Sequence, residues 1–336
     1  MVTKIAINGF GRIGRNILRA IVEDRKENLD VIAINDSGSI ETNIHLLKYD
    51  SVHGRFPKDI DIYDMETINI SGKHIKKLSN RNPETLPWKD LDIDIVLECT
   101  GKFNHKDLAI KHIQSGAKKV LISAPALKAD ITSVFGVNHK NIGKNHTIIS
   151  NASCTTNALA PIAMVLNNSV GIESAFMTTI HSYTGDQPTL DRNHKDLYRS
   201  RSAAQSIIPT FTGAAEAVGE VLPELKGKID GVAMRVPTPN VSVIDLKFTC
   251  SRDTTIEEIN QIFIDASKTI LKNIIDITEE KLVSIDLNHD NHSAIIAIDQ
   301  TKVLNKRFVR VMAWYDNEWG FSHRMCDIAT LIGKLL

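Results

Sequence analysis

The stretch KIAINGFGRIGR, Lys4–Arg15, decides the fold of the first part of this chain. Its opening run is short, apolar and β-branched, which predicts a buried strand, and Gly9, Gly11 and Gly14 follow where a helix is predicted to begin. Glycines at these positions permit a tight turn, close approach of a pyrophosphate and close packing of the helix on the strand. The first N–H groups of such a helix point at a bound phosphate. The stretch therefore predicts a strand–turn–helix unit that binds a dinucleotide.

An acidic residue ends the next predicted strand, DVIAIND (30–36). Asp36 stands about 20 residues beyond the glycines, a spacing at which a carboxylate meets the ribose of a bound dinucleotide. Its oxygens accept hydrogen bonds from both ribose hydroxyls, and its charge repels a 2′-phosphate. Three glycines alone also occur in turns that bind no cofactor, but together with Asp36 they favour NAD over NADP.

Short β-branched runs alternate with helical patterns over residues 1–152. The runs KIAING, DVIAIND, DIDIVLEC, KVLISA and HTIIS read as strands, and the segments 12–23 and 106–115 as helices. This alternation predicts an α/β fold with a parallel sheet of the Rossmann type. Between Phe56 and Leu78, polar and apolar residues alternate around a Ser71-Gly72 turn, which indicates a hairpin-like insertion at an edge of that sheet.

The character of the sequence changes after Asn151. A helix is predicted from about Cys154 to Asn167, then an apolar run to Tyr183 and a polar loop from about 184 to 209, which is long enough to be functional or interfacial. Later strand-like runs predict an α+β domain with a mostly antiparallel sheet over residues 153–318. Residues 319–336 have helical apolar spacing and are expected to pack back onto the first domain.

Charge and cysteine content exclude several classes of function. The 336 residues include forty basic and forty acidic side chains, so no general field attracts nucleic acid or anionic lipid. The four cysteines lie far apart, with no CxxC pair and no metal-ligand spacing, which fits a reducing compartment. No apolar stretch approaches the ~20 residues of a membrane span, and the opening residues resemble a strand instead of an export signal. We expect a cytoplasmic protein with a small-molecule partner, no metal, and neither a membrane nor a nucleic-acid partner.

Cys154 is the candidate nucleophile, in the segment SNASCTTN (150–157). A thiol in the first turn of a helix is next to unpaired N–H groups and the positive end of the macrodipole, and both favour the thiolate. Ser153 and Thr155 add hydroxyl groups beside it. A single cysteine is also often a small buried helix residue, and spacing alone leaves both interpretations open.

His181 is the candidate base, at the end of the apolar run where the predicted strand meets the polar loop. A neutral imidazole at the edge of a cleft can take a proton from a thiol or from a substrate hydroxyl. Any one of the twelve histidines taken alone is more often structural, and the sequence by itself does not prove that His181 meets Cys154.

Eight motifs together resemble the glyceraldehyde-3-phosphate dehydrogenase family, in its phosphorylating, glycolytic type. They are NGFGRIGR, YDSVHGRF, SNASCTTN, HSYTGDQ, HKDL, PTFTGAA, GVAMRVPTPNVSVIDL and WYDNEWG. The motifs occur in the family's order without a large gap, so the resemblance covers essentially the whole chain. It implies an NAD-binding Rossmann domain at 1–152, completed by a helix at about 319–336, and a catalytic domain at 153–318.

The resemblance also implies a reaction. The Cys154 thiolate attacks the aldehyde of D-glyceraldehyde 3-phosphate to form a hemithioacetal, and His181 acts as base while hydride passes to NAD. The resulting thioester is attacked by inorganic phosphate, which releases 1,3-bisphosphoglycerate. The long loop after His181 resembles the family's inter-subunit loop, which implies a homotetramer.

Further site residues follow from the resemblance, position by position. The substrate phosphate is expected at Thr184 and Arg235, and inorganic phosphate at Ser153, Thr155, Thr212 and Gly213 with Arg199 close by. Guanidinium groups and hydroxyls suit this task because they make charge-assisted hydrogen bonds to oxyanions. The residues expected around NAD are Gly9, Gly11, Arg12, Ile13 and Gly14 near the pyrophosphate, Asp36 at the ribose, Arg81 near the adenine, Thr100 and Ser123 in the groove, and Asn317 at the carboxamide.

Departures from the family's pattern leave alternatives open. Ala158 stands where many relatives carry a second cysteine, so a local disulfide with Cys154 cannot form. Ser37 follows Asp36 where NAD-specific relatives often have leucine, and Arg192 and Asn193 replace an apolar pair, so use of NADP stays open. Erythrose-4-phosphate dehydrogenase is the nearest rival, but it typically lacks the intact TGAA and HSYT segments found here. A non-enzymatic binding role as the main function finds no support in the zero net charge.

Overall fold

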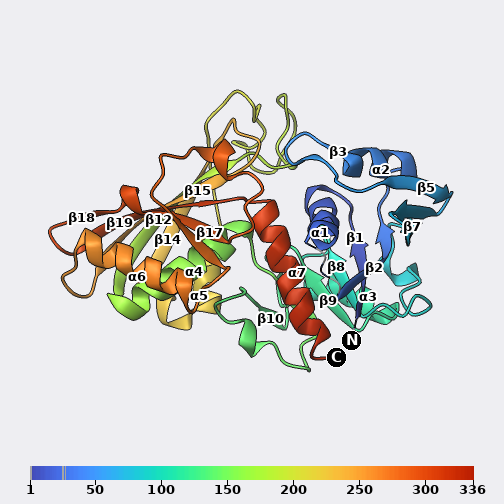
Figure 1. Cartoon of the computed structure of the whole chain (residues 1–336), viewed down its shortest axis with the longest axis horizontal. Helices are drawn as coiled ribbons and strands as arrows, with labels where there is room; N and C mark the ends of the chain where they lie inside the picture. Colours follow the sequence, from blue (N-terminus) through green and yellow to red (C-terminus); the bar gives the residue numbers. More distant parts are fainter. Residues whose placement is uncertain (1, 25, 27) are drawn as a thin grey trace. The chain divides into compact units, whose positions relative to one another are not determined.

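Contacts within the chain divide it into two compact units. The computed structural model describes residues 2–24, 26 and 28–336. Unit 1 contains Met1–Ser133, His139–Ala152 and Ser322–Leu336, and unit 2 contains Val134–Asn138 and Ser153–Phe321. Each unit has its own large sheet (Figure 1).

The sheet of unit 1 has nine strands in the order β10-β11-β9-β8-β1-β2-β7-β6-β5. Every neighbouring pair from β10 to β7 is parallel, which confirms the predicted α/β fold. The strands are β1 (Thr3–Asn8), β2 (Leu29–Asn35), β5 (Ile60–Asp64), β6 (Thr67–Ile70), β7 (Lys73–Leu78), β8 (Ile95–Glu98), β9 (Lys119–Ile122), β10 (Ile131–Thr132) and β11 (Ile148–Ser150), with β3 (Tyr49–Asp50) and β4 (Gly54–Arg55) as a separate pair. The carboxyl ends of β1, β2 and β8 therefore lie together at one edge, where parallel sheets bind ligands.

Apolar side chains of these strands pack against helices to form the core of unit 1. The helices of this unit are α1 (Arg12–Glu23), α2 (Ile40–Lys48), α3 (Lys106–Gln114) and most of α7 (Trp319–Gly333). Val96, Val120 and Ala109 of α3 are fully buried in one cluster with Trp88. The part of α7 in this unit is tied to its other elements by a hydrogen bond of 2.8 Å from Asn28 Nδ2 to Thr330 Oγ1.

The segment predicted as a hairpin-like insertion is more than a hairpin. β5, β6 and β7 form an antiparallel meander, and β7 then pairs in parallel with β2, so it continues the central sheet. The Ser71-Gly72 turn joins β6 to β7 with positive φ at both residues, as a tight hairpin requires. The alternating pattern predicted the meander but did not reveal that β7 continues the parallel sheet.

Unit 2 has an eight-stranded sheet that is mostly antiparallel, as predicted for an α+β domain. β14 beside β12 and β16 beside β17 are its parallel pairs. The strands are β12 (Ile172–Ser182), β13 (Ile208–Thr210), β14 (Ile229–Val236), β15 (Ser242–Cys250), β16 (Ile275–Thr278), β17 (Ala294–Ala297), β18 (Lys302–Leu304) and β19 (Phe308–Tyr315), and the helices are α4 (Cys154–Ser169), α5 (Ala214–Val221) and α6 (Ile256–Lys268). α4 is buried along most of its length and contacts α5, α6 and the sheet strands β12 and β15.

The long loop predicted after β12 covers residues 183–207, since β13 begins at Ile208. Its own polar groups hold it together: Asp191 accepts hydrogen bonds from the Ser202 N–H and from Arg201. Leu197 and Tyr198 nevertheless stay exposed, at 81% and 62%.

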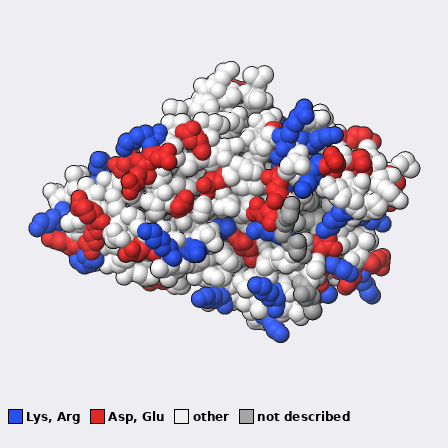
Figure 2. Space-filling model, viewed as in Figure 1, with Lys and Arg blue, Asp and Glu red and all other residues white. Residues whose placement is uncertain are grey.

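The charged side chains show no large region of one sign on the face seen in Figure 2, where Lys and Arg alternate with Asp and Glu. Among the described residues, no helix combines the length and apolar character that crossing a bilayer requires. Likewise, no cluster of three or more His, Cys, Asp or Glu side chains in the described ranges is arranged to hold a metal ion.

Candidate active site

Cys154 is the first residue of α4, as the sequence predicted. The chain reaches it through Ala152, whose φ of 54° lies in the left-handed region, and through Ser153, the N-cap. The Ser153 hydroxyl accepts a hydrogen bond of 3.0 Å from the Thr156 N–H, which satisfies one of the free donors of the first turn. Cys154 is therefore held at a helix N-terminus, and the residue is half-buried.

His181 lies at the end of β12 with its imidazole beside that thiol. Its Nε2 is 3.5 Å from Cys154 Sγ, so the structure brings the two predicted residues together. Its Nδ1 is 2.6 Å from the Ser182 carbonyl oxygen, which can only accept, so the ring proton is on Nδ1. The lone pair on Nε2 then faces the thiol, which is the tautomer that a general base needs.

Burial shapes the protonation of this pair. Burial, assisted by the nearby charge of Arg235, lowers the pKa of His181 to about 3. Burial also raises the pKa of the Cys154 thiol above its ordinary value, although Arg235 and hydrogen bonds from Thr155 oppose this. The helix N-terminus and the His181 partner favour the predicted thiolate, whereas burial opposes it.

Arg235 of β14 supplies a positive charge beside the pair. Its Nη1 donates to the Ser182 carbonyl at 2.9 Å and to Thr184 Oγ1 at 3.0 Å, and it lies 3.1 Å from Nδ1 of His181. β14 pairs in parallel with β12, and this register places His181 and Arg235 opposite each other. The predicted substrate-phosphate residues, Thr184 and Arg235, are thus in direct contact.

Arg199 joins this group through Asp186, a residue that the sequence reasoning did not select. Asp186 accepts hydrogen bonds from Thr184 and, at 3.2 Å, from Arg199 Nη1. Arg199 also donates to Thr210 Oγ1 at 2.9 Å and to the Phe211 carbonyl. The carboxylate binds Arg199 directly and is linked to Arg235 through Thr184. Its position two residues after Thr184 in HSYTGDQ was the available signal.

The residues predicted for inorganic phosphate occupy two helix starts. Ser153 and Thr155 belong to the turn of Cys154, and Thr155 Oγ1 lies 4.0 Å from its sulfur. Gly213 is the N-cap of α5, where the Thr212 hydroxyl accepts a hydrogen bond of 3.2 Å from the Ala214 N–H. Hydroxyls and N–H groups at helix N-termini are suited to binding anions.

Tyr315 of β19 was missed by the sequence analysis. Its hydroxyl lies 2.8 Å from Thr155 Oγ1 and 2.9 Å from Thr179 Oγ1, and its ring meets His181 edge to face at 5.9 Å. This buried tyrosine therefore connects α4, β12 and β19 behind the thiol and the imidazole. It stands two residues before Asn317 in the motif WYDNEWG, and this position was the available signal.

Asn317 is oriented by Ser242, another residue that the sequence did not reveal. Ser242 Oγ donates to Asn317 Oδ1 at 2.8 Å and accepts from the Ser182 N–H at 3.1 Å. With Oδ1 of Asn317 accepting from Ser242, Nδ2 is left as the donor end of the amide. One buried hydroxyl therefore links the amide to the strand that carries His181.

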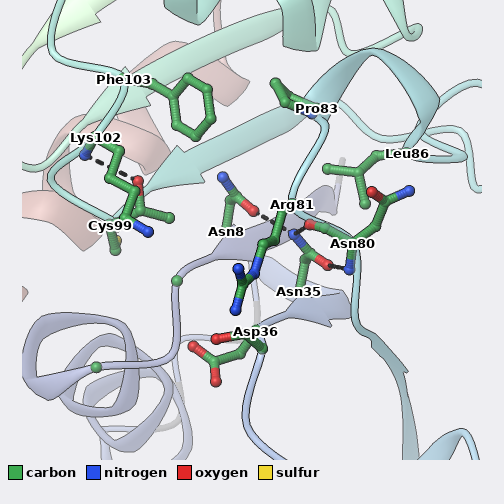
Figure 3. A pocket seen from close by; sticks show the side chains of 14 residues that line it. Asn8, Asn35, Asp36, Asn80, Arg81, Pro83, Leu86, Cys99, Lys102 and Phe103 are labelled. Carbon is green, nitrogen blue, oxygen red and sulfur yellow. Dashed lines mark hydrogen bonds between the residues drawn. The ribbon is translucent and has the colours of Figure 1, made fainter.

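The expected dinucleotide pocket lies within unit 1 at the carboxyl ends of its parallel strands (Figure 3). Its lining residues are Asn8, Gly9, Gly11, Asn35, Asp36, Ser37, Asn80, Arg81, Pro83, Leu86, Cys99, Thr100, Lys102 and Phe103. Five of the predicted residues are among them: Gly9, Gly11, Asp36, Arg81 and Thr100.

The surroundings of the three glycines explain why each position has no side chain. A Cβ at Gly14 would lie 2.1 Å from the Gly9 carbonyl oxygen, and one at Gly9 would lie 2.7 Å from the Thr100 nitrogen. A Cβ at Gly11 would meet nothing within 4 Å and would extend into open space at the start of α1. Gly9 and Gly14 are thus required by packing, whereas Gly11 leaves room for a ligand.

Other predicted cofactor residues lie next to the pocket. Arg12 forms a two-pronged ion pair with buried Asp50, which was not predicted, with N–O distances of 2.5 and 3.1 Å. Although burial opposes it, the Arg12 guanidinium and the N–H groups of Val52 and His53 hold the pKa of Asp50 well below its usual range. Ile13 continues the first turn of α1, and the Ser123 N–H donates to the carbonyl of Glu98.

A buried network beneath the pocket was also missed. Glu98 accepts hydrogen bonds from the Thr100 N–H at 2.8 Å and from Asn8 Nδ2 at 2.6 Å, and His112 Nε2 lies 3.1 Å away. Trp88 Nε1 donates to His112 Nδ1 at 3.0 Å, so the ring proton of His112 is on Nε2 and points at the carboxylate. These groups are far apart in sequence, and no local pattern joins them.

Comparisons with known proteins agree in their result. Family models described as glyceraldehyde 3-phosphate dehydrogenase, NAD binding domain and C-terminal domain, match residues 3–106 and 153–317. The chain is 59% identical to a glyceraldehyde-3-phosphate dehydrogenase of Xanthobacter flavus and 57% identical to one of Cereibacter sphaeroides, each over the full length of both chains. It is 51% identical to glyceraldehyde-3-phosphate dehydrogenase 2 of Bacillus subtilis, over 98% of this chain and 96% of that relative.

Proposed function

The chain belongs to the glyceraldehyde-3-phosphate dehydrogenase family, and from this premise we propose which of its residues carry each part of the reaction. The protein is an NAD-dependent oxidoreductase that acts on glyceraldehyde 3-phosphate. The observation that supports the assignment of residues best is the 3.5 Å approach of Cys154 Sγ to His181 Nε2, with Arg235 beside both.

In the first step the Cys154 sulfur bonds to the aldehyde carbon. The thiol proton leaves toward Nε2 of His181, whose lone pair faces it, and the carbonyl oxygen gains a proton to give a hemithioacetal. Because the low pKa of His181 keeps the imidazole neutral at physiological pH, a base is available before the attack. The imidazolium formed by proton transfer is transient and returns its proton to the developing alkoxide.

In the second step the hemithioacetal carbon loses a hydride, and its hydroxyl proton passes to Nε2 of His181. NAD, when bound, would supply the acceptor for that hydride, which carries the hydrogen together with its two bonding electrons. The carbon is thereby oxidised to a thioester on Cys154. Nδ1 of His181 keeps its hydrogen bond to the Ser182 carbonyl throughout, which holds the ring in the orientation that receives the proton.

The third step needs an anion as nucleophile. An oxygen of inorganic phosphate attacks the thioester carbon, the carbon–sulfur bond breaks, and the sulfur leaves as a thiolate that regains a proton from the imidazolium. We propose Ser153, Thr155, Thr212 and Gly213, with Arg199 close by, for that phosphate. The contact of Thr184 with Arg235 supports their role at the substrate phosphate.

The pocket of unit 1 fits the adenosine and pyrophosphate of NAD. The carboxylate of Asp36 is held by N–H groups of Phe10 and Gly38 at 2.9 and 2.8 Å, which leaves lone pairs for ribose hydroxyls. The space over Gly11 at the start of α1 suits a pyrophosphate. We assign Arg12, Ile13, Thr100 and Ser123 to positions around the same cofactor, with Arg81 at the adenine and Asn317 at the carboxamide.

The proposal extends to domain roles, assembly and location. Residues 1–152 with 319–336 serve as the cofactor domain and 153–318 as the catalytic domain. The exposed apolar side chains in the loop 183–207, Leu197 and Tyr198 among them, support its burial between subunits of a homotetramer. We place the assembled enzyme in the cytoplasm, where its partners would be glyceraldehyde 3-phosphate and inorganic phosphate.

Initial rates separate this function from its rivals. Glyceraldehyde 3-phosphate and erythrose 4-phosphate are compared, each with NAD and NADP, with and without inorganic phosphate, and Cys154→Ser serves as the matched control. We expect sustained NADH formation with glyceraldehyde 3-phosphate only when phosphate is present. Sustained turnover without phosphate, or a preference for the four-carbon sugar, would contradict the phosphorylating assignment.

A further inference from the structure

Lys77 occupies an unusual place for a charged residue, beneath the main chain of Asp36. It lies on β7, is only 7% exposed, and its Nζ donates to the carbonyl oxygens of Asp36 at 2.7 Å and Leu78 at 2.8 Å. Burying an ammonium group is unfavourable unless it is well paired. Two carbonyl oxygens are only partial compensation, and the negative charge of Asp36 adds a favourable Coulombic interaction.

The two charges influence each other. Burial raises the pKa of the Asp36 carboxyl, but the N–H groups of Phe10 and Gly38, the Asn43 amide and the charge of Lys77 together bring it below its ordinary value. Burial lowers the pKa of the Lys77 ammonium, and Asp36 works in the opposite direction. Asp36 therefore presents its carboxylate to the pocket with a cation close behind it.

Ser37 leaves room for a group beyond the ribose. It lines both the dinucleotide pocket and an adjoining hollow, and Lys77 lines that hollow as well. Glu41, Asp64 and Glu66 also line it, but they are exposed, so solvent and salt screen their charges. The charge of Lys77 is screened far less because the side chain is buried.

We propose that Lys77 is a second determinant of cofactor selectivity, whose buried ammonium offsets the field of Asp36 where a 2′-phosphate would lie. The pocket then discriminates against NADP less strongly than Asp36 alone would dictate. This inference rests on the proposed cofactor site at Asp36. It assigns Lys77 an electrostatic role and no contact with the reacting atoms.

The test compares two ligands that differ only in the 2′-phosphate, 5′-AMP and adenosine 2′,5′-bisphosphate, by calorimetric titration of the intact protein. Lys77→Met removes the charge and the donor, and Lys77→Gln removes the charge but keeps an N–H donor for the Asp36 carbonyl. Lys76→Met is the matched control, because Lys76 is the neighbour on β7 whose side chain points to the other face of the sheet. Thermal unfolding shows whether each variant folds.

Both Lys77 variants are expected to weaken the bisphosphate about threefold to tenfold while 5′-AMP binding changes less than about twofold. Lys76→Met leaves both affinities near their starting values. The inference is wrong if Lys77→Gln behaves like the parent protein, because the hydrogen bond would then be what matters, or if 5′-AMP weakens as much as the bisphosphate. Failure of the parent protein to bind 5′-AMP would instead overturn the cofactor site itself.

Discussion

Cys154 differs from the other cysteines in its partners, and only Cys99 shares its half-buried position. Cys250 and Cys326 are fully buried, and burial raises the pKa of their thiols to about 11 and about 12. Burial raises the pKa of Cys99 further. Cys154 keeps partial exposure, and its upward shift is opposed by Arg235. In addition, the imidazole of His181 lies close enough to the Cys154 thiol to act as its base.

Brief treatment with substoichiometric iodoacetate is therefore expected to label Cys154 first and to abolish activity in proportion. Cys154→Ser should fold and bind NAD but catalyse almost nothing, since a serine hydroxyl is a poor nucleophile at its usual pKa. Peptide mapping of the first modified thiol is the measurement. The assignment fails if Cys99, Cys250 or Cys326 is modified first while activity falls in step.

Ser242 provides a second test at the scale of single residues. Ser242→Ala removes the hydroxyl that orients Asn317 and leaves the Ser182 N–H without that acceptor. Loss of a neutral hydrogen bond of about 1 kcal/mol predicts a fall in kcat/KM of roughly fivefold. Ser174→Ala, at an exposed position of β12, is the control. Unchanged kinetics in Ser242→Ala would show that the orientation of Asn317 does not limit the reaction.

The turn between β1 and α1 depends more on the close approach of two backbone segments than on side-chain contacts. Gly14 lets α1 lie against the Gly9 carbonyl, whereas Gly11 has normal backbone angles and open space around it. The same motif therefore contains two glycines required by packing, Gly9 and Gly14, and one, Gly11, that leaves space for the ligand. Sequence spacing alone treats them as equivalent.

Alanine at each position should separate these roles. Gly14→Ala is expected to lower the free energy of unfolding by about 1–3 kcal/mol, because the new methyl group overpacks the contact with β1. Gly11→Ala should unfold like the parent protein but bind NAD more weakly, since the methyl group would occupy the space over the helix start. Thermal unfolding and calorimetry measure the two effects. Equal losses of stability would remove the distinction.

Elements formed by short-range patterns could be predicted from the sequence, and long-range partners could not. The parallel strands, the helix at Cys154 and the long loop after β12 followed from periodicity and turn residues. The continuation of the sheet by β7 depends on its pairing with β2, which no local signal records. Tyr315 and Ser242 were missed for the same reason: they reach the site only because β15 pairs with β12 and β19 pairs with β15.

The stability of the whole molecule depends on carboxylates that accept hydrogen bonds from donors within their own unit. Asp130 is an example: it accepts hydrogen bonds from the Thr147 N–H and hydroxyl and from the Ile148 N–H, and it pairs with Lys106. Burial works against its charge, but these donors outweigh burial and hold the pKa of Asp130 well below its usual range. Protonation of such groups would weaken the edge of the sheet near β10 and β11.

The protein should therefore become less stable in acid, because the pKa of Asp130 is lower in the folded state than in the unfolded state. A carboxyl whose pKa is lower in the folded state stabilises the fold above its unfolded pKa of about 3.9 and loses that contribution as the pH falls toward the folded value. Asp130→Asn should lower the unfolding midpoint at pH 7, and its difference from the parent should shrink below about pH 4. Asp61→Asn, at an exposed position of β5, is the control. A difference that stays constant with pH would contradict the role of charge.

The division of the chain also affects how the protein is made. Unit 1 includes Ser322–Leu336, which the ribosome reaches only after about 170 residues beyond Ala152 have been added. At a synthesis rate of roughly 5–20 residues per second, this is a delay on the order of ten to thirty seconds. During that time unit 1 lacks the helix that carries Met325, Cys326 and Ile328, which are fully buried in the finished fold. Apolar surface of unit 1 is thus open to proteases and chaperones while unit 2 is still being synthesised. Ribosome-bound chains stalled before Ser322 should be cleaved within unit 1 by a dilute protease, whereas chains stalled well beyond Leu336 by an added linker should resist it.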